Sequence, residues 1–194
     1  MNRNQVLPQV ELSAEPSALR RVDFCASHAY KGEGFLNIQA LPRIAEAVAS
    51  IEAGDGFNWQ VDTYFVDSPG SAPKQMLDLE LKGCLHLVCQ RCLQECALDL
   101  METRQFFFVA SESEAEAYPM EDDQLEPLVA SQQFDLLETI EDEILLSLPL
   151  ITKHPEGVCE AHVLTLGVSE GGSDDSEKRE NPFNILKSMK KNSQ

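Results

Sequence analysis

Alternation of apolar and polar positions dominates the middle of the chain. Every second residue between positions 77 and 87 is Leu except Gly83, and polar residues lie between them. A period of two is typical of a strand with one buried and one wet face. Residues 57–66 alternate in the same way, and residues 98–109 resume this character. The pattern therefore predicts three consecutive strands, with weaker signals for strands near residues 19–25 and 34–39.

A helical period follows the weak strand at residues 34–39. Pro42 suits the first position of a helix, and Ile44, Val48 and Ile51 recur at the spacing of one helix face. Gly54 then favours termination. We expect a helix between Pro42 and Gly54 that packs these three apolar side chains against the sheet.

A second helix is predicted after residue 135. Asp135 can cap its first turn, with Glu138 three residues later as in a capping box, and Pro149 ends it. One face of this helix is apolar, and we expect the opposite, acidic face to contact water. The apolar stripe is Leu137, Ile140, Ile144 and Leu148, and the acidic face is Glu141, Asp142 and Glu143.

These elements predict an α+β fold in a single domain, residues 1–166. It consists of an antiparallel sheet, curled or barrel-like, with two covering helices. Residues 111–126 are acidic and poor in large apolar groups, which predicts a mobile loop. Residues 167–180 have the composition of a flexible linker, and residues 181–194 predict a short basic amphipathic tail helix.

Charge is distributed unevenly along this fold. The chain has 194 residues with 15 basic and 33 acidic side chains, a net charge of −18. Residues 111–180 alone carry 3 basic and 19 acidic side chains, whereas residues 181–194 carry a net charge of +3. Broad binding to nucleic-acid phosphates or to an anionic membrane needs a basic face, so both are excluded. A small local contact with RNA remains compatible with this distribution.

The sequence shows neither a secretory signal nor a membrane-spanning segment, which bears on the compartment in which the protein is found. The first 18 residues contain no apolar core of the kind found in secretory signals, and the longest apolar run, residues 144–151, is interrupted by Ser147 and Pro149. A membrane span needs roughly 20 apolar residues. We expect a cytoplasmic protein whose thiols are reduced, without a disulfide framework.

The six cysteines include one Cys-x-x-Cys pair, Cys89 and Cys92, in the connection between two predicted strands. A zinc knuckle has this arrangement and needs two more ligands, for which Cys159 with His154 or His162 are the candidates. Cys96 is too close in sequence to complete the site easily. A thioredoxin-like redox site is disfavoured because no helix follows the pair. A single pair favours the simpler alternative, in which Cys84, Cys89 and Cys92 are reduced core thiols near a sheet edge.

The remaining residues give little support to catalysis. No histidine belongs to a recognisable nucleophile motif, and no glycine-rich phosphate loop is present. We therefore expect neither catalytic residues nor a small-molecule substrate.

The C-terminal tail has a clearer pattern, which suits either a helix docked on the protein's own core or a tethered recognition helix for a groove on a partner. Its apolar face is Phe183, Leu186 and Met189, and its basic residues are Lys187, Lys190 and Lys191.

Four blocks follow one another along the chain: Leu87–Leu93, Phe134–Pro149, His154 with Cys159, and Asn181–Lys191. In this order they resemble the YceD family, whose members are called large ribosomal RNA subunit accumulation proteins. The similarity is strong from about Leu77 to the end and loose before it. It implies a role in the synthesis, processing or stability of 23S ribosomal RNA and supplies no catalytic residues. Many relatives have a second cysteine cluster after the helix that would complete a metal site, whereas this chain has only Cys159 there.

The resulting prediction is a non-enzymatic, cytoplasmic factor that supports 23S ribosomal RNA accumulation. We expect a ribosomal protein or assembly factor as its partner, with a local contact to ribosomal RNA and none to membranes. The predicted contact residues are Gln90 and Arg91 in the Cys-x-x-Cys connection and the six apolar and basic residues of the tail helix. Two alternatives remain open: an acidic adaptor that binds basic ribosomal proteins, and a zinc- or thiol-dependent RNA-processing enzyme.

Overall fold

The computed structural model describes residues 8–67, 70, 72–118 and 125–159. The chain divides into two units, Met1–Ala161 and His162–Gln194, and all described residues belong to the first. The predicted linker at 167–180, the tail helix at 181–194 and the candidate ligand His162 lie outside the described residues. Among those that are described, no helix is long and apolar enough to cross a bilayer.

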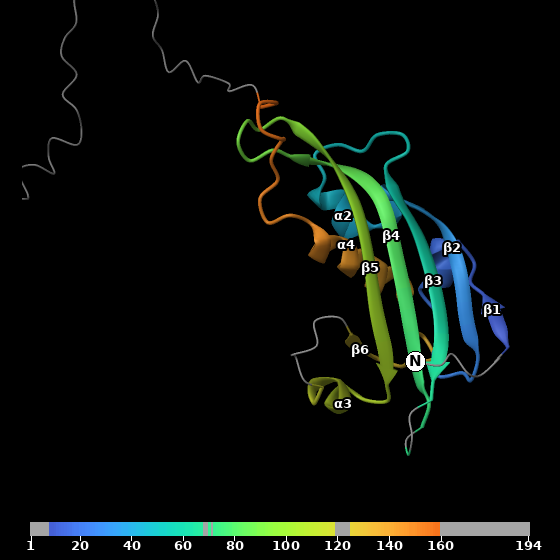
Figure 1. Cartoon of the computed structure of the whole chain (residues 1–194). Coiled ribbons are helices and arrows are strands. Elements are labelled where there is room, and N and C mark those ends of the chain that lie inside the picture. The colour runs from blue at the N-terminus through green and yellow to red at the C-terminus, as the bar shows by residue number, and fades with distance from the viewer. Residues whose placement is uncertain (1–7, 68–69, 71, 119–124, 160–194) are drawn as a thin grey trace, which may run out of the picture. The chain divides into compact units, whose positions relative to one another are not determined.

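Six strands form one sheet in the order in which they occur along the chain (Figure 1). Strands β2 to β5 pair antiparallel, as predicted, but β1 pairs parallel with β2, and β6 pairs parallel with β5. The sheet is therefore mixed and open, and the predicted barrel closure is not observed. The strands are β1 (Gln9–Glu11), β2 (Ala29–Asn37), β3 (Gly56–Val66), β4 (Lys74–Val88), β5 (Glu95–Val109) and β6 (Glu126–Val129).

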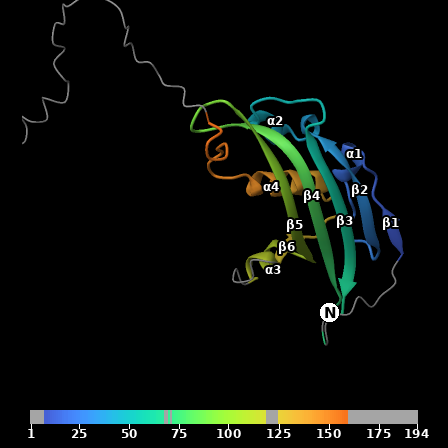
Figure 2. The same ribbon diagram turned by 45° about the horizontal axis from the view of Figure 1, so that its top comes forward.

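Helices cover one face of this sheet. Figures 1 and 2 show α1, α2 and α4 on the same side, whereas α3 lies beside β6 at one end. The α+β prediction is confirmed, with more helices than the two expected. They are α1 (Pro16–Leu19), the 3-10 turn η1 (Ile38–Ala40), α2 (Pro42–Ala47), α3 (Glu112–Glu116) and α4 (Leu136–Ser147).

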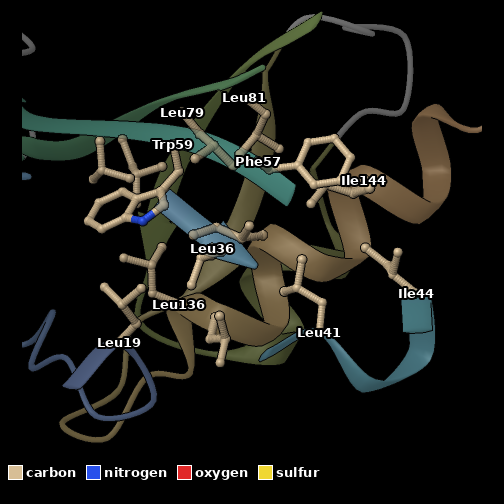
Figure 3. Close-up of a cluster of buried hydrophobic side chains, with 14 of the residues drawn as sticks. Leu19, Leu36, Leu41, Ile44, Phe57, Trp59, Leu79, Leu81, Leu136 and Ile144 are labelled. Carbon is tan, nitrogen blue, oxygen red and sulfur yellow. The ribbon is translucent and has the colours of Figure 1, made fainter. Parts of the chain in front are cut away.

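The hydrophobic core fills the space between the helices and the inner face of the sheet (Figure 3). The register pairs Trp59 with Leu81 and Val61 with Leu79, so the odd positions of β3 and β4 share this inner face. From the other side, Leu136 and Ile144 of α4 pack against them and are fully buried. Alternation along the strands and the helical stripe of α4 therefore meet in one core, as the pattern predicts.

Two expected elements near the N-terminus differ from the structure. The strand predicted at 19–25 is replaced by α1 and a single bridge between Val22 and Phe134. The helix predicted to reach Gly54 ends at Ala47, because Val48 is extended and the N–H of Ala49 donates to the carbonyl of His86, 2.7 Å away. Ile51 is consequently 42% exposed rather than buried. The hydrogen bond to β4 therefore replaces the one that the Ala49 N–H would make within a continued helix.

The acidic segment 111–126 also contains more structure than expected. Ser111 caps α3 by accepting a hydrogen bond from the N–H of Glu114, and Glu126 begins β6. Tyr118, which follows this helix, places its ring 4.7 Å from that of Phe107. At least these parts of the segment are ordered against the sheet, contrary to the prediction of a mobile loop.

The acidic face predicted for α4 is wrong for two of its three residues. Asp135 caps the helix as expected, accepting from the N–H of Glu138 at 2.9 Å. Glu141 and Glu143, however, are each only 4% exposed. Arg43 of α2 contacts Glu141, and Arg104 of β5 lies 3.0 Å from Glu143. Basic partners from distant parts of the sequence make the burial of these carboxylates possible.

Candidate metal centre at the end of the β4–β5 hairpin

The connection between β4 and β5 is a short, hydrogen-bonded turn. The N–H of Cys89 donates to the carbonyl of Gln94, and the N–H of Leu93 donates to the carbonyl of Cys89, both at 2.8 Å. Leu93 has a φ of 60°, a left-handed conformation that a bulky residue rarely adopts. This geometry tightens the turn so that the side chains of Cys89 and Cys92 are both buried beneath it.

A segment after α4 returns to this turn. The N–H of Gln90 donates to the carbonyl of Thr152 at 2.9 Å, which fixes the two backbones side by side. The Nε2 atom of His154 lies 2.8 Å from the carbonyl oxygen of Glu95. Because a carbonyl only accepts, Nε2 must carry the proton there, and Nδ1 faces the cysteines. Metal-ligating histidines are commonly oriented by such a hydrogen bond from their second nitrogen.

Four potential ligands converge as a result. The Sγ atoms of Cys89, Cys92 and Cys159 and a ring nitrogen of His154 all lie within 4.8 Å of one another. The Cys89 and Cys159 sulfurs are 3.5 Å apart, and Nδ1 of His154 lies 3.4 Å from Cys92 Sγ and 3.5 Å from Cys159 Sγ. The structure thus brings together the four residues that the sequence nominated, although metal binding itself remains a prediction.

These distances match the spacing that a tetrahedral metal imposes on its ligands. With Zn–S bonds of about 2.3 Å and Zn–N bonds of about 2.0–2.1 Å, ideal tetrahedral angles separate two sulfurs by about 3.8 Å and a sulfur from a nitrogen by about 3.6 Å. The three separations given above are shorter than these values by up to about 0.3 Å, and the remaining ones are no longer than 4.8 Å, so modest side-chain movements separate the four residues from a zinc-bound arrangement. Three thiolates and one imidazole are also a donor set that zinc favours.

The electrostatics of the centre favour the thiolate form of Cys89 and Cys159 but not that of Cys92. A hydrogen bond from the backbone N–H of Gln94 lowers the pKa of Cys92, but burial and the neighbouring sulfurs of Cys159 and Cys89 outweigh it and raise that pKa. Burial raises the pKa of Cys89, but hydrogen bonds from the backbone N–H groups of Cys92, His154 and Arg91 outweigh it and lower the pKa to about 5. Burial likewise raises the pKa of Cys159, and a hydrogen bond from the Arg91 guanidinium brings that pKa below its ordinary value. Since the thiolate is the form that binds metals, both effects prepare the site for a cation.

The other cysteines occupy different environments. Cys96 packs beside Cys89 and Cys92 but lies outside the group of four, and burial raises its pKa. Burial also raises the pKa of Cys84, whereas Cys25 is exposed. Cys89 and Cys92 are free and buried in one cluster with Cys96, so the alternative of reduced core thiols fits them as well as a metal site does. They lie in the turn at the end of the β4–β5 hairpin, and the two strands are inside the sheet rather than at its lateral edge.

A second polar cluster nearby was not predicted from the sequence. Potential ligand atoms of Glu52, His86 and Glu95 also lie within 4.8 Å of one another. Nδ1 of His86 is 3.1 Å from the carboxylate of Asp55, and this hydrogen bond raises the pKa of His86. The two glutamates add to that effect, which identifies the cluster as an ionic network around one histidine. Three separate segments form it, so no local motif could have revealed it.

The exposed surface at this end of the hairpin has two components. Gln90 and Arg91, which the sequence nominated as contact residues, are both exposed there. Large exposed apolar side chains that the sequence did not nominate lie on the same turn and on the segment after α4 that is hydrogen-bonded to it. Their exposed fractions are 74% for Leu93, 95% for Leu150, 49% for Ile151 and 58% for Val158. The nominated residues of the tail helix lie outside the described residues.

Comparison with known proteins identifies the family. The family model described as large ribosomal RNA subunit accumulation protein YceD matches residues 77–190. The chain belongs to the YceD family. A protein of Haemophilus influenzae named large ribosomal RNA subunit accumulation protein YceD is 27% identical over 192 residues, covering 94% of this chain and 97% of that protein. No solved structure matches the chain significantly. The YceD match begins in β4 and includes all four residues of the candidate metal centre.

Proposed function

We propose that this chain is a non-enzymatic, cytoplasmic factor that supports the accumulation of 23S ribosomal RNA in large-subunit biogenesis. The observation that carries this proposal is the alignment over 94% of the chain with a relative that is named for this role. Because the similarity spans nearly the whole length of both proteins, it includes the sheet, α4 and the hairpin end rather than one shared module. Accumulation here covers the synthesis, processing or stability of the RNA.

The four-residue centre fits a structural metal better than a catalytic one. Catalytic zinc sites keep one coordination position for water or substrate, whereas structural sites fill all four with protein side chains. Cys89, Cys92, His154 and Cys159 supply four donors, of which two are fully or nearly fully buried. In this proposal they bind Zn²⁺, which ties the segment after α4 to the β4–β5 turn. The metal would stabilise the hairpin end and supply no chemistry.

The hairpin end is the proposed contact with large-subunit components. Gln90 and Arg91 contribute polar groups, and Leu93, Leu150 and Ile151 provide an apolar surface beside them. Exposed apolar side chains clustered at a rigid tip are typical of protein interaction sites. A ribosomal protein or assembly factor is therefore the proposed direct partner, with Arg91 available for one local RNA contact.

Crosslinking in growing cells tests this function directly. The tagged full-length chain would be crosslinked and purified, and the RNA and proteins recovered with it would be identified. We expect 23S ribosomal RNA or proteins of the large subunit. Exclusive recovery of proteins unrelated to ribosomes would overturn the proposal.

A cleavage assay separates this function from an RNA-processing enzyme. The purified chain would be incubated with precursor ribosomal RNA and Mg²⁺, with heat-denatured chain as the control. We expect the precursor to stay intact. Cleavage at a defined position, lost in the denatured control, would show that the chain is an enzyme.

A further inference from the structure

The sheet has an outer face that the core helices do not cover (Figure 2). Positions that alternate with the buried ones point away from α1, α2 and α4, and most of them are exposed. Tyr118 covers only one end of this face, where it contacts Phe107. Over the remaining part of strands β2 to β5, none of the described helices covers this surface, and the candidate metal centre does not use it.

Two neighbouring rows of residues cross the middle of this outer face. The register places Glu33, Gln60, Glu80 and Thr103 in one row and Phe35, Asn58, Lys82 and Met101 in the next. Shallow hollows of about 400 and about 630 Å³ lie over these rows, and both are lined by Asn58, Lys82 and Met101. Side chains in adjacent rows are close enough to contact the same ligand.

The second row contains apolar side chains that a solvated sheet face does not require. Met101 is 77% exposed and Phe35 is 45% exposed. The water-facing side of an antiparallel sheet is normally polar, so apolar residues at its centre are a cost unless something covers them. Methionine is also suited to binding sites because its unbranched, polarisable chain adapts to different partners.

Charge identifies the chemistry of that partner. The outward positions of β2 to β5 include six carboxylates and only three lysines. Repulsion from the carboxylates disfavours the phosphates of RNA, whereas a basic protein segment is complementary to them. The carboxylates are Glu33, Asp62, Asp78, Glu80, Glu95 and Asp99, and the lysines are Lys31, Lys74 and Lys82.

We propose that the outer face of the sheet binds a lysine- or arginine-rich protein segment that places apolar side chains against Met101 and Phe35. Glu33 and Glu80 contact the basic groups of that segment, and Met101 contacts its apolar group. This inference rests on the proposed function, because the segment would belong to a protein of the large ribosomal subunit. It adds a surface distinct from the hairpin end and specifies a protein rather than RNA as its ligand.

Binding measurements with charge-reversed chains test this proposal. The full-length chain, the double variant Glu33→Lys/Glu80→Lys and the variant Met101→Glu would each be immobilised. The probes are basic proteins extracted from purified large subunits, identified after elution, and protein-free 23S ribosomal RNA. Leu146→Glu is the matched control, because Leu146 is 69% exposed on α4, away from the outer face.

We expect the wild-type chain and Leu146→Glu to bind at least one basic protein equally. Both outer-face changes should weaken that binding about tenfold at low salt, and the double variant should lose less when salt screens the charges. If the double variant does not fold, Met101→Glu alone decides the question. Equal binding by the outer-face variants, binding of RNA alone, or coverage of this face by a second copy of the chain would overturn the inference.

A complementation experiment distinguishes this inference from the proposed function. If cells that lack the chain keep normal 23S ribosomal RNA, the proposed function fails whatever the binding results. If those cells lose 23S ribosomal RNA and Met101→Glu restores it as fully as wild type, with unchanged protein binding, only the outer-face inference fails.

Discussion

Glu141 offers a quantitative test of how the two main helices are joined. Leu41, the residue before α2, provides no side-chain cap for that helix. Glu141 of α4 supplies one instead, because its carboxylate accepts from the backbone N–H groups of Arg43 at 2.7 Å and Ile44 at 3.3 Å. It also accepts from the Arg43 side chain at 3.1 Å. Changing Glu141 to Ala would leave these donors without this acceptor. Glu141 is only 4% exposed, so little water can replace its carboxylate.

The expected cost follows from the two backbone donors. A buried donor left without a partner costs about 1–3 kcal/mol, so the loss of partners for two donors in Glu141→Ala should lower the free energy of unfolding by about 2–6 kcal/mol. Glu141→Gln keeps an oxygen that can accept, and we expect it to lose about 1–2 kcal/mol. The order wild type, Gln, Ala is itself a prediction, because a purely steric role would make Gln equal to Glu.

Urea unfolding monitored by circular dichroism measures these differences. Glu46→Ala is the matched control, since Glu46 is an exposed acidic residue on α2 and should change stability by less than about 0.5 kcal/mol. If Glu141→Ala were no more destabilising than Glu46→Ala, the proposed cap between the helices would be refuted.

Two further predictions concern the hairpin end. Elemental analysis of protein purified without chelator should find about one zinc per chain. The variant Cys92→Ser should lose this zinc, whereas the control Cys25→Ser should keep it. Less than about a tenth of an equivalent of zinc in the wild-type protein would end the metal proposal. The hydrogen bond that the His86 ring donates to the Asp55 carboxylate raises the pKa of His86. Its stabilising effect is therefore complete below the unfolded pKa of about 6.5 and disappears as pH rises through the higher folded pKa. His86→Gln should therefore lower the Tm more at pH 6 than at pH 9, and an equal decrease at both values would contradict this assignment.

Local periodicity was sufficient to predict the central part of the fold. The alternation around Leu77–Leu87 specified β4, and the stripe that contains Ile140 and Ile144 specified α4 together with its cap at Asp135. These signals are local because the pleat and the helical turn directly determine which side chains share a face. The Cys-x-x-Cys spacing similarly identified a hairpin turn and nominated Cys159 and His154 as partners.

What the sequence could not show depends on contacts between distant segments. The burial of Glu141 requires Arg43, and that of Glu143 requires Arg104; neither pair is visible as a local motif. The early end of α2 depends on the hydrogen bond between Ala49 and His86, which lies in another strand. The parallel edge strands follow from long connections rather than tight turns, which have a weaker sequence signature.

Acute depletion of the chain tests the central claim most directly. Newly made 23S and 16S ribosomal RNA would be pulse-labelled before and after depletion, with wild-type chain re-expressed as the control. We predict that the ratio of 23S to 16S falls soon after depletion and recovers on re-expression. An unchanged ratio in cells that have lost the chain would contradict the assignment to large-subunit ribosomal RNA accumulation.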